Sequence, residues 1–306
     1  MSRGDAPTWT RAQLDVAAAQ AVEVLRERRT EPLGRYSEIW DECFQEVSEF
    51  LELTVQLNHV SELARDLFTQ PDRLTIARYL TGPVVSEDDL KLLADVRLGR
   101  RALAKDATAA SRIAEYVMEN LDRNRFPWVY EGRTDPEERE VAAAIVATAS
   151  MLANQRMQTI RRNEARAKLE ADVAAMLTRC GFIEAPTPVR VDNSKDYPDR
   201  GRFLRGVQLG SHQADVFVGL RDGRHMPVEC KVSFSHLNSI KRLKDTAARA
   251  KDWVEVVGKQ NTVPVGVIAG AFKPEGLVKA QDAGLTIIWG HDLAPLRQFV
   301  QSAGTQ

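Results

Sequence analysis

The stretch "QADVFVGLRDGRHMPVECKV" (residues 213–232) holds two apolar runs joined by a short polar loop. A three-residue loop, Arg221-Asp222-Gly223, with the glycine in the left-handed conformation, is a common β-hairpin connection. Counting outward from this loop sets Asp215 opposite Glu229. A two-residue loop would shift the register and place these carboxylates on opposite faces of the sheet. The three-residue register keeps each face uniform, so we predict that Asp215 and Glu229 lie side by side.

In this register one face of the hairpin is polar and the other is apolar. The polar face holds Asp215, Glu229 and Lys231, and the apolar face holds Val216, Val218, Leu220, Val228, Cys230 and Val232. Two adjacent carboxylates repel each other unless a cation lies between them. Oxygen ligands in an open site suit Mg²⁺, and a nearby lysine can hold a water and offset charge that grows on phosphorus. The pattern predicts metal-assisted phosphodiester hydrolysis, and a surface hairpin with an ordinary Glu–Lys pair is the alternative.

The remainder of the chain divides into a helical part and a mixed part. From about residue 10 to 180 the apolar spacing is helical, with Thr10 as an N-cap and Ser86 with Asp89 as a capping box. The segment at 135–182 is long for one helix, and we expect a break near residues 160–165. After it, residues 183–206 indicate a loop with one strand near 189–191, followed by strands that alternate with helices.

We therefore expect an α+β or α/β fold with two domains. Residues 1–160 should form an all-α domain, and residues 161–306 should form a mixed central sheet of about four to five strands flanked by helices. The 306 residues carry a net charge of −1, so any DNA-binding surface must be local. Three cysteines without CxxC spacing and no apolar run long enough to span a membrane indicate a cytoplasmic protein.

The hairpin resembles the catalytic core of the PD-(D/E)xK nuclease superfamily. The matching residues are Ala214-Asp215 and the triplet Glu229-Cys230-Lys231. A glutamate about eleven residues before a Gly-Phe pair is common in that superfamily, and Glu170 stands eleven residues before Gly181. The resemblance implies that Asp215 and Glu229 hold Mg²⁺, that Lys231 assists catalysis, and that Glu170 is an auxiliary catalytic residue. The alternative for Glu170 is a solvated charge on a helix.

More of the chain is similar to type II restriction endonucleases of the XamI kind. The matching stretches are "LTGPVVSEDDLK", "RRNEARAKLE", "PVECKVSFSHLNSIKRL", "AKDWVEVVG" and "AGLTIIWGHDLAPL". The stretch "GSHQADVFVGL" departs from that kind because it lacks basic residues near His212 and Gln213, and Phe234 stands where a small polar residue is usual. The resemblance implies Mg²⁺-dependent, sequence-specific double-strand cleavage of DNA to 5′-phosphate and 3′-hydroxyl ends.

This resemblance also implies partners. Double-stranded DNA is the expected substrate, a DNA methyltransferase encoded nearby would protect the host, and membranes play no part. Cutting both strands of a palindrome favours a homodimer, with the domain at 1–160 serving recognition and dimerisation and the nuclease domain at 161–306. The alternatives are another PD-(D/E)xK nuclease that acts in repair, nicking or RNA cleavage, and a non-catalytic DNA-binding protein on the same fold.

Polar and basic residues near the hairpin are candidates for DNA contacts. A loop that becomes a helix near Asn238 would direct its N-terminus at phosphates, and arginines on a neighbouring loop could contact guanine. An ordinary solvated helix and loop are the alternative. The candidates are Ser233, Ser235, Asn238, Ser239, Lys241, Arg242, Lys244, Arg200, Arg202 and Arg205.

Overall fold

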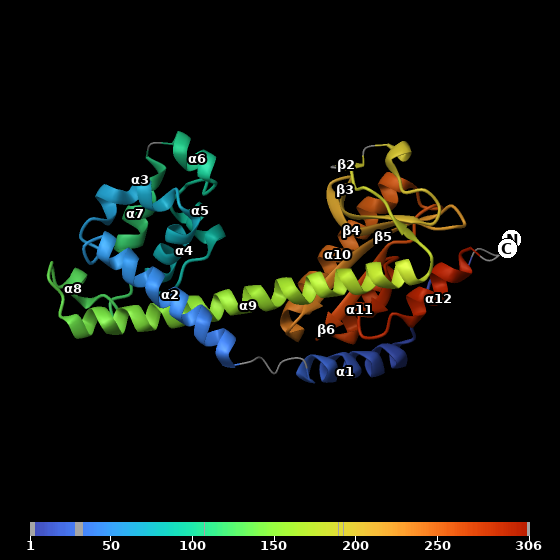
Figure 1. Ribbon diagram of the computed structural model, residues 1–306, viewed down its shortest axis with the longest axis horizontal. Coiled ribbons are helices and arrows are strands. Elements are labelled where there is room, and N and C mark those ends of the chain that lie inside the picture. The colour runs from blue at the N-terminus through green and yellow to red at the C-terminus, as the bar shows by residue number, and fades with distance from the viewer. Residues whose placement is uncertain (1–3, 28–32, 107, 189, 192, 305–306) are drawn as a thin grey trace. The chain divides into compact units, whose positions relative to one another are not determined.

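The computed structural model describes residues 4–27, 33–106, 108–188, 190–191 and 193–304, apart from the side chains of Leu33, Leu237 and Asn238. The chain divides into two compact units, one formed by residues 32–160 and one by residues 1–31 together with 161–306 (Figure 1). The helix α1 (Arg11–Glu27) therefore belongs with the second half of the chain, although we expected it in the helical domain. Its buried face, which includes Leu14 and Ala21, belongs to one core cluster with apolar residues of two strands and two helices from that half.

The unit at 32–160 is all-helical, as predicted. The N-cap predicted at Ser86 is confirmed, because its hydroxyl accepts a hydrogen bond from the backbone N–H of Asp89 at 3.0 Å. The Asp89 carboxylate accepts from the same hydroxyl at 2.7 Å, which differs from the reciprocal backbone bond of a capping box. The apolar faces of these helices form one core around residues such as Phe50, Phe68 and Trp128. The helices are α2 (Leu33–Leu53), α3 (Val60–Phe68), α4 (Pro71–Leu80), α5 (Glu87–Leu93), α6 (Arg100–Lys105), α7 (Ala109–Glu119), α8 (Pro127–Tyr130) and the first part of α9 (Glu138–Arg179).

The helix α9 runs for 42 residues without interruption, so the predicted break near residues 160–165 is wrong. The segment contains no proline or glycine, and sharp kinks in helices almost always need such a residue or an inserted group. What changes at this point is the packing of the helix. Residues up to Met157 pack in the core of the helical unit, and residues from Leu169 onward pack in the core of the other unit.

The second unit is built on one seven-stranded mixed sheet in the order β1-β3-β4-β5-β6-β7, with β2 also paired to β3. The strands β3, β4 and β5 form an antiparallel meander, and β6 and β7 then add parallel to β5. The elements after α9 are β1 (Ile183–Glu184), β2 (Arg190–Val191), η1 (Ser194–Asp196), β3 (Arg202–Leu209), β4 (His212–Gly219), β5 (His225–Ser233), α10 (His236–Val257), β6 (Val265–Gly270), α11 (Pro274–Asp282), β7 (Thr286–Trp289) and α12 (Ala294–Ser302).

The predicted fold class is confirmed, but the sheet has seven strands instead of the four to five expected, and the sequence did not indicate β1 or β3. The strand β3 begins at Arg202, inside the region expected to be a loop. Its apolar residues do not alternate regularly, because Phe203 and Leu204 are both buried and Gly206 has a left-handed φ of 61°. A glycine in a strand interior often marks a local change of twist or a bulge, and it hides the two-residue period of the strand.

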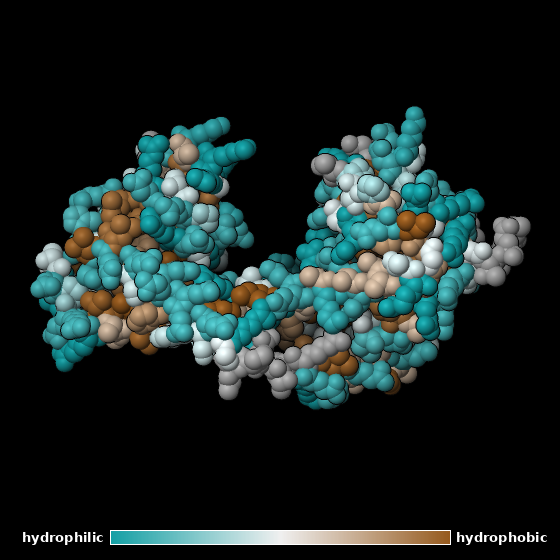
Figure 2. All heavy atoms as spheres, viewed as in Figure 1, coloured by the Kyte–Doolittle hydropathy of each residue, from teal (hydrophilic) through white to brown (hydrophobic). Residues whose placement is uncertain are grey.

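Helices cover both faces of this sheet. The C-terminal half of α9 and the helix α12 pack on one face, where the cluster includes Val173, Val228 and Phe299. The helices α10, α11 and α1 cover the other face, where the clusters include Trp253 and Leu277. No helix among the described residues is long and apolar enough to cross a membrane. On the face seen in Figure 2, most of the surface is hydrophilic.

Candidate active site

The hairpin has the predicted register. The backbone N–H of Leu220 donates to the carbonyl of Arg224 at 2.8 Å, and Gly223 has φ 91°. The strand ladder then runs from Gly219↔His225 to Val216↔Val228. The same count would place Asp215 opposite Glu229, but the ladder ends at Val216↔Val228, so this pairing stays a prediction. The six apolar residues predicted for the other face all belong to one core cluster.

The strands β4 and β5 part at Asp215. The next hydrogen-bonded pair of the ladder would join the N–H of Cys230 to the carbonyl of Ala214. Instead, the Cys230 N–H donates to the carboxylate Oδ2 of Asp215 at 2.7 Å. The alternation of side chains between the two faces is also broken here. Ala214 packs with Trp253 on the face covered by α10, whereas Val216, two residues later, packs on the face covered by α9 and α12. Asp215 therefore stands where the hairpin opens, with its carboxylate in place of a backbone acceptor.

The Asp215 carboxylate is buried and bound to an arginine of α9. Its side chain is 2% exposed, and its Oδ1 accepts a hydrogen bond from Nη2 of Arg166 at 2.5 Å. The same guanidinium donates through Nε to Oε1 of Glu170 at 2.7 Å. Burial and then the negative charge of Asp215 raise the pKa of Glu170, against the opposing effect of Arg166. Glu170 therefore lies beside Asp215, and one cation binds both carboxylates.

The Glu229 carboxylate is fully buried and contacts two cations. Nζ of Lys231 forms an ion pair with its Oε1, and Nη1 of Arg249 on α10 lies 2.9 Å from both of its oxygens. The Lys231 side chain is only 19% exposed, so this lysine faces inward rather than into bulk solvent. A buried charge needs such partners to offset the loss of its hydration. Glu229 and Lys231 are thus in contact, as their spacing on one strand predicts.

The negative charges of three carboxylates act on Cys230. Burial raises the pKa of the Cys230 thiol well above its usual range, and the charges of Asp215, Glu170 and Glu229 raise it further. These three carboxylates are matched by three cations, Arg166, Lys231 and Arg249. The result is a concentrated and nearly neutral set of charges at the point where the hairpin opens.

The donors at this place fit a hard cation that retains part of its water. Asp215 and Glu229 offer only oxygen, and each already binds a cationic group. Among the described residues no three of His, Cys, Asp and Glu come together closely enough to enclose a metal by themselves. Mg²⁺ commonly binds through one or two carboxylates plus water and substrate phosphate, so a two-carboxylate site is compatible with it.

Two of the serines predicted to contact DNA lie in the protein interior. Ser233 is fully buried and its hydroxyl donates to the carbonyl of Ser235 at 2.8 Å. Ser239 is fully buried as well, and its hydroxyl donates to the carbonyl of His236 at 2.7 Å. These hydroxyls stabilise the turn from β5 into α10, and we no longer count them as DNA contacts. The helix begins at His236, two residues before the expected start, and the side chain of Asn238 is outside the described residues.

The basic residues of α10 divide into two kinds. Lys241 and Lys244 are exposed, and neither has an ion pair or hydrogen bond within the described part of the chain. Arg242 is half-buried and donates through Nη1 to the carbonyl of Val232. Burial, and then the charge of Arg162, lower the pKa of the Arg242 guanidinium. Lys241 and Lys244 are therefore free to contact a phosphate, whereas Arg242 serves the junction between β5 and α10.

The three arginines expected on a loop lie in different settings. Arg200 is exposed and its guanidinium lies against Gly223 of the hairpin loop. Arg202 starts β3, is 48% exposed and lies 3.9 Å from the carboxylate of Asp199. Arg205 is half-buried on β3, and its charge acts on the carboxyl group of Glu170. Arg205 is therefore the member of this set that lies near the buried carboxylates.

The sequence analysis missed the two arginines that bind these carboxylates. Arg166 precedes Glu170 by four residues on a helix, a spacing that favours an ion pair, so part of its role was visible in the sequence. Its contact with Asp215 joins residues 49 apart, and no local pattern indicates it. Arg249 lies 20 residues after Glu229 on the following helix, and only the packing of α10 on the sheet brings them together.

Comparisons with known proteins identify the family of this chain. A sequence profile of the XamI restriction endonuclease family matches residues 58–289, which include the hairpin and most of the helical unit. The chain is also 35% identical over 269 residues to the type II restriction enzyme XamI from Xanthomonas campestris pv. amaranthicola, across 84% of this chain and 95% of that protein. With a family profile that spans most of its length and a relative of this similarity, the chain belongs to the XamI restriction endonuclease family.

Proposed function

We propose that this protein is an Mg²⁺-dependent type II restriction endonuclease that cuts both strands of a specific DNA sequence to leave 5′-phosphate and 3′-hydroxyl ends. Its family is one of site-specific deoxyribonucleases, which supports the reaction class. The observation that carries the proposal is the opened hairpin, where Asp215 accepts a hydrogen bond from the backbone N–H of Cys230 and Lys231 contacts Glu229. A shared fold alone does not decide function, so the proposal depends on the residues of this site.

Each residue of the site has a distinct proposed role. Asp215 and Glu229 would hold Mg²⁺, which when bound supplies a positive charge that polarises the phosphodiester and a water of lowered pKa. Lys231 lies beside Glu229 and can orient that water through its ammonium donors and offset negative charge on the phosphate. Glu170 can accept a proton from a water near Asp215, because burial keeps its pKa above the usual range.

The proposed reaction on both strands calls for two sites. One site of this kind hydrolyses one strand per encounter, so we propose that the active form is a homodimer whose two-fold axis matches that of a palindromic target. The all-helical unit at 32–160 is proposed to serve recognition or dimerisation, since the unit with the sheet must leave its hairpin open to DNA.

The test is cleavage of unmethylated phage or plasmid DNA by the purified protein with Mg²⁺. We expect discrete bands with the wild type, none when EDTA replaces Mg²⁺, and none with the variant Glu229→Ala. Sequencing of the band ends identifies the target and the end chemistry. Nicked circles without linear product would favour the nicking or repair alternative, and degradation of RNA but not DNA would favour the RNA-cleaving one. DNA binding without cleavage under any metal would favour the non-catalytic alternative.

A further inference from the structure

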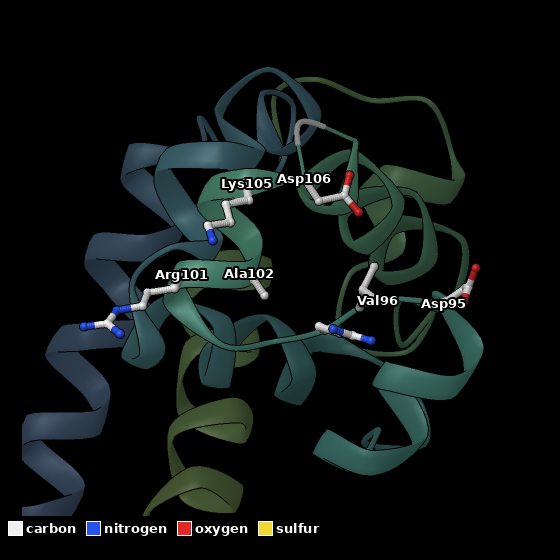
Figure 3. A pocket seen from close by; sticks show the side chains of 7 residues that line it. Asp95, Val96, Arg101, Ala102, Lys105 and Asp106 are labelled. Carbon is white, nitrogen blue, oxygen red and sulfur yellow. The ribbon is translucent and has the colours of Figure 1, made fainter.

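A small basic surface stands apart from the hairpin, on the helical unit. Arg97, Arg100, Arg101 and Lys105 lie between the end of α5 and the end of α6, with no acidic residue from 96 to 105. We refer to these four residues as the α5–α6 basic cluster. Three of them, Arg97, Arg101 and Lys105, line an open hollow of about 580 Å³ (Figure 3).

Buried neighbours fix the direction of these side chains. Val96 and Leu98 are each 8% exposed and Leu103 is 2% exposed, and all three belong to the core of the helical unit. With these residues anchored inside, the four basic residues of the cluster are left at the surface. In Figure 3, Arg101 and Lys105 extend from α6 toward the same side. The backbone therefore presents these four basic side chains to solvent.

The cluster has no acidic partner among the described residues, unlike three other arginines of the same unit. Arg125 pairs with Asp122, Arg133 with Glu140 and Arg156 with Glu46. The two acidic residues at the hollow are not available to the cluster in the same way. Asp106 is bound to Thr108 and Arg112, and the side chain of Asp95 points away from the hollow in Figure 3. Four cations thus remain free at one place.

The rest of the helical unit makes this concentration unusual. Residues 32–160 contain 15 Lys and Arg against 22 Asp and Glu, so this unit as a whole repels a polyanion. Within this acidic unit, four basic residues fall between positions 97 and 105 with no acidic residue among them. A cluster of this kind in an acidic unit restricts the approach of a polyanion to one surface and one orientation.

We infer that the α5–α6 basic cluster binds the phosphate backbone of double-stranded DNA and is the surface by which the helical unit meets the substrate. This inference rests on the proposed function and specifies where the helical unit contacts the DNA. Phosphates need only positive charge and donors, which exposed arginines and lysines supply, and such contacts give affinity without sequence specificity. The cluster should therefore change how tightly DNA is held and leave the choice of cleavage site unaltered.

The test compares two triple variants of the full-length protein. One carries Arg97→Gln, Arg101→Gln and Lys105→Gln. The control carries Arg65→Gln, Arg123→Gln and Arg139→Gln, three exposed arginines of the same unit outside the cluster, with the same change in net charge. Binding to a linear plasmid fragment is measured in EDTA over a range of salt concentrations, since phosphate contacts do not require the target sequence.

For the cluster variant we expect the slope of log Kd against log salt to fall by about 2 to 3 units, since each phosphate contact contributes about 0.9. The control should change the slope by less than one unit. With Mg²⁺, both variants should give the wild-type band pattern. If the triple variant does not give a wild-type melting curve, Lys105→Gln alone should lower the slope by about 0.9.

Two results would overturn the inference while leaving the proposed function intact. In the first, the wild type binds and cuts DNA, and the cluster variant shows the same slope of log Kd against log salt as the wild type. The other is a cluster variant that sediments as a smaller species and keeps the wild-type slope per subunit, which would make the cluster a contact with a second copy of the chain. A wild type that neither binds nor cuts DNA would instead contradict the proposed function itself.

Discussion

The two units of the chain carry opposite net charge, and they use their cations differently. Residues 32–160 have seven more acidic than basic residues, and the rest of the chain has 27 Lys and Arg against 21 Asp and Glu. In the unit with the sheet, Arg166, Lys231 and Arg249 contact carboxylates that are largely or wholly buried. In the helical unit, the α5–α6 basic cluster is exposed and contacts none of the described acids.

The cations of the two units therefore have different roles, which the net charge of −1 for the whole chain does not show. Buried cations next to carboxylates hold a site together and compete with any metal for the same oxygens. Exposed cations without partners keep their charge available for a polyanion, at the expense of being weakened by salt. Substitutions at the two places should therefore change different measured quantities, and the predictions that follow use this difference.

The largest effect is expected at the opened hairpin. Replacing Asp215 by Asn or Glu229 by Ala removes a proposed metal ligand, and cleavage should fall by at least about 10³-fold, since metal stabilisation of the transition state amounts to several kcal/mol. DNA binding in EDTA should persist, because these buried carboxylates do not attract phosphate. Single-turnover cleavage and a binding titration on the same preparations measure both quantities.

The control for this pair is Asp172→Asn, which removes an exposed ion pair with Lys168 on α9. An exposed pair contributes about 0–1 kcal/mol, so this variant should cut at close to the wild-type rate. Cleavage by Glu229→Ala within about threefold of the wild type would mean that this hairpin is not the catalytic site.

A smaller and opposite effect is expected when Arg166 becomes Gln. Arg166 binds Oδ1 of Asp215 in the described structure, so a metal that uses this oxygen must displace the guanidinium. Removing the positive charge should tighten the binding of Mn²⁺ in the absence of DNA by about tenfold, which corresponds to about 1.4 kcal/mol. Calorimetric titration of the DNA-free protein gives the measurement.

For Arg166 the matched control is Arg179→Gln, an exposed arginine at the end of the same helix, which should leave Mn²⁺ binding unchanged. The Arg166→Gln protein should also melt at a lower temperature without metal, because Asp215 and Glu170 then face each other without their shared cation. Weaker Mn²⁺ binding by Arg166→Gln would show that this arginine supports the metal site and does not compete for it.

Substitutions at Lys241 and Arg242 should have different effects, because we expect Lys241 to contact DNA and Arg242 to stabilise the fold. Lys241→Ala removes an exposed cation, and the salt slope of DNA binding should fall by about one unit with an unchanged melting temperature. Arg242→Ala removes a donor to the Val232 carbonyl, which should cost about 1–3 kcal/mol and lower the melting temperature by a few degrees.

Salt-dependent binding and thermal melting of both variants decide this point. The same loss of salt slope in Arg242→Ala as in Lys241→Ala, with no loss of stability, would place Arg242 on the DNA surface. A normal slope in Lys241→Ala would remove the start of α10 from the proposed DNA contacts.

The smallest effect concerns two cysteines, one from each unit. Burial raises the pKa of the thiols of Cys43 and Cys230, so less of each is present as the reactive thiolate at pH 8 than for an exposed cysteine. Both should react with a thiol reagent much more slowly in the native protein than in denaturant. Peptide mapping during a denaturant titration shows whether Cys43 and Cys230 become reactive together or in separate steps, and rapid labelling of either in the native protein would contradict its burial.

The sequence by itself determined the hairpin and much of the fold around it. The apolar residues at every second position fixed the buried face, and Gly223 fixed the loop, so the register of the hairpin from Gly219↔His225 to Val216↔Val228 followed by counting. The capping residues Thr10 and Ser86 likewise marked helix starts that the structure confirms. These features depend on residues within a few positions of each other, where periodicity and backbone preference decide the outcome.

Only the tertiary structure decided which groups meet these carboxylates. Arg166 and Arg249 reach Asp215 and Glu229 from α9 and α10, across 49 and 20 residues of sequence. Packing also buried Ser233 and Ser239, which local polarity had suggested for the surface, and it divided α9 between two cores without a break. Such contacts form when helices distant in sequence pack on the faces of a sheet, and the local spacing of residues cannot predict that packing.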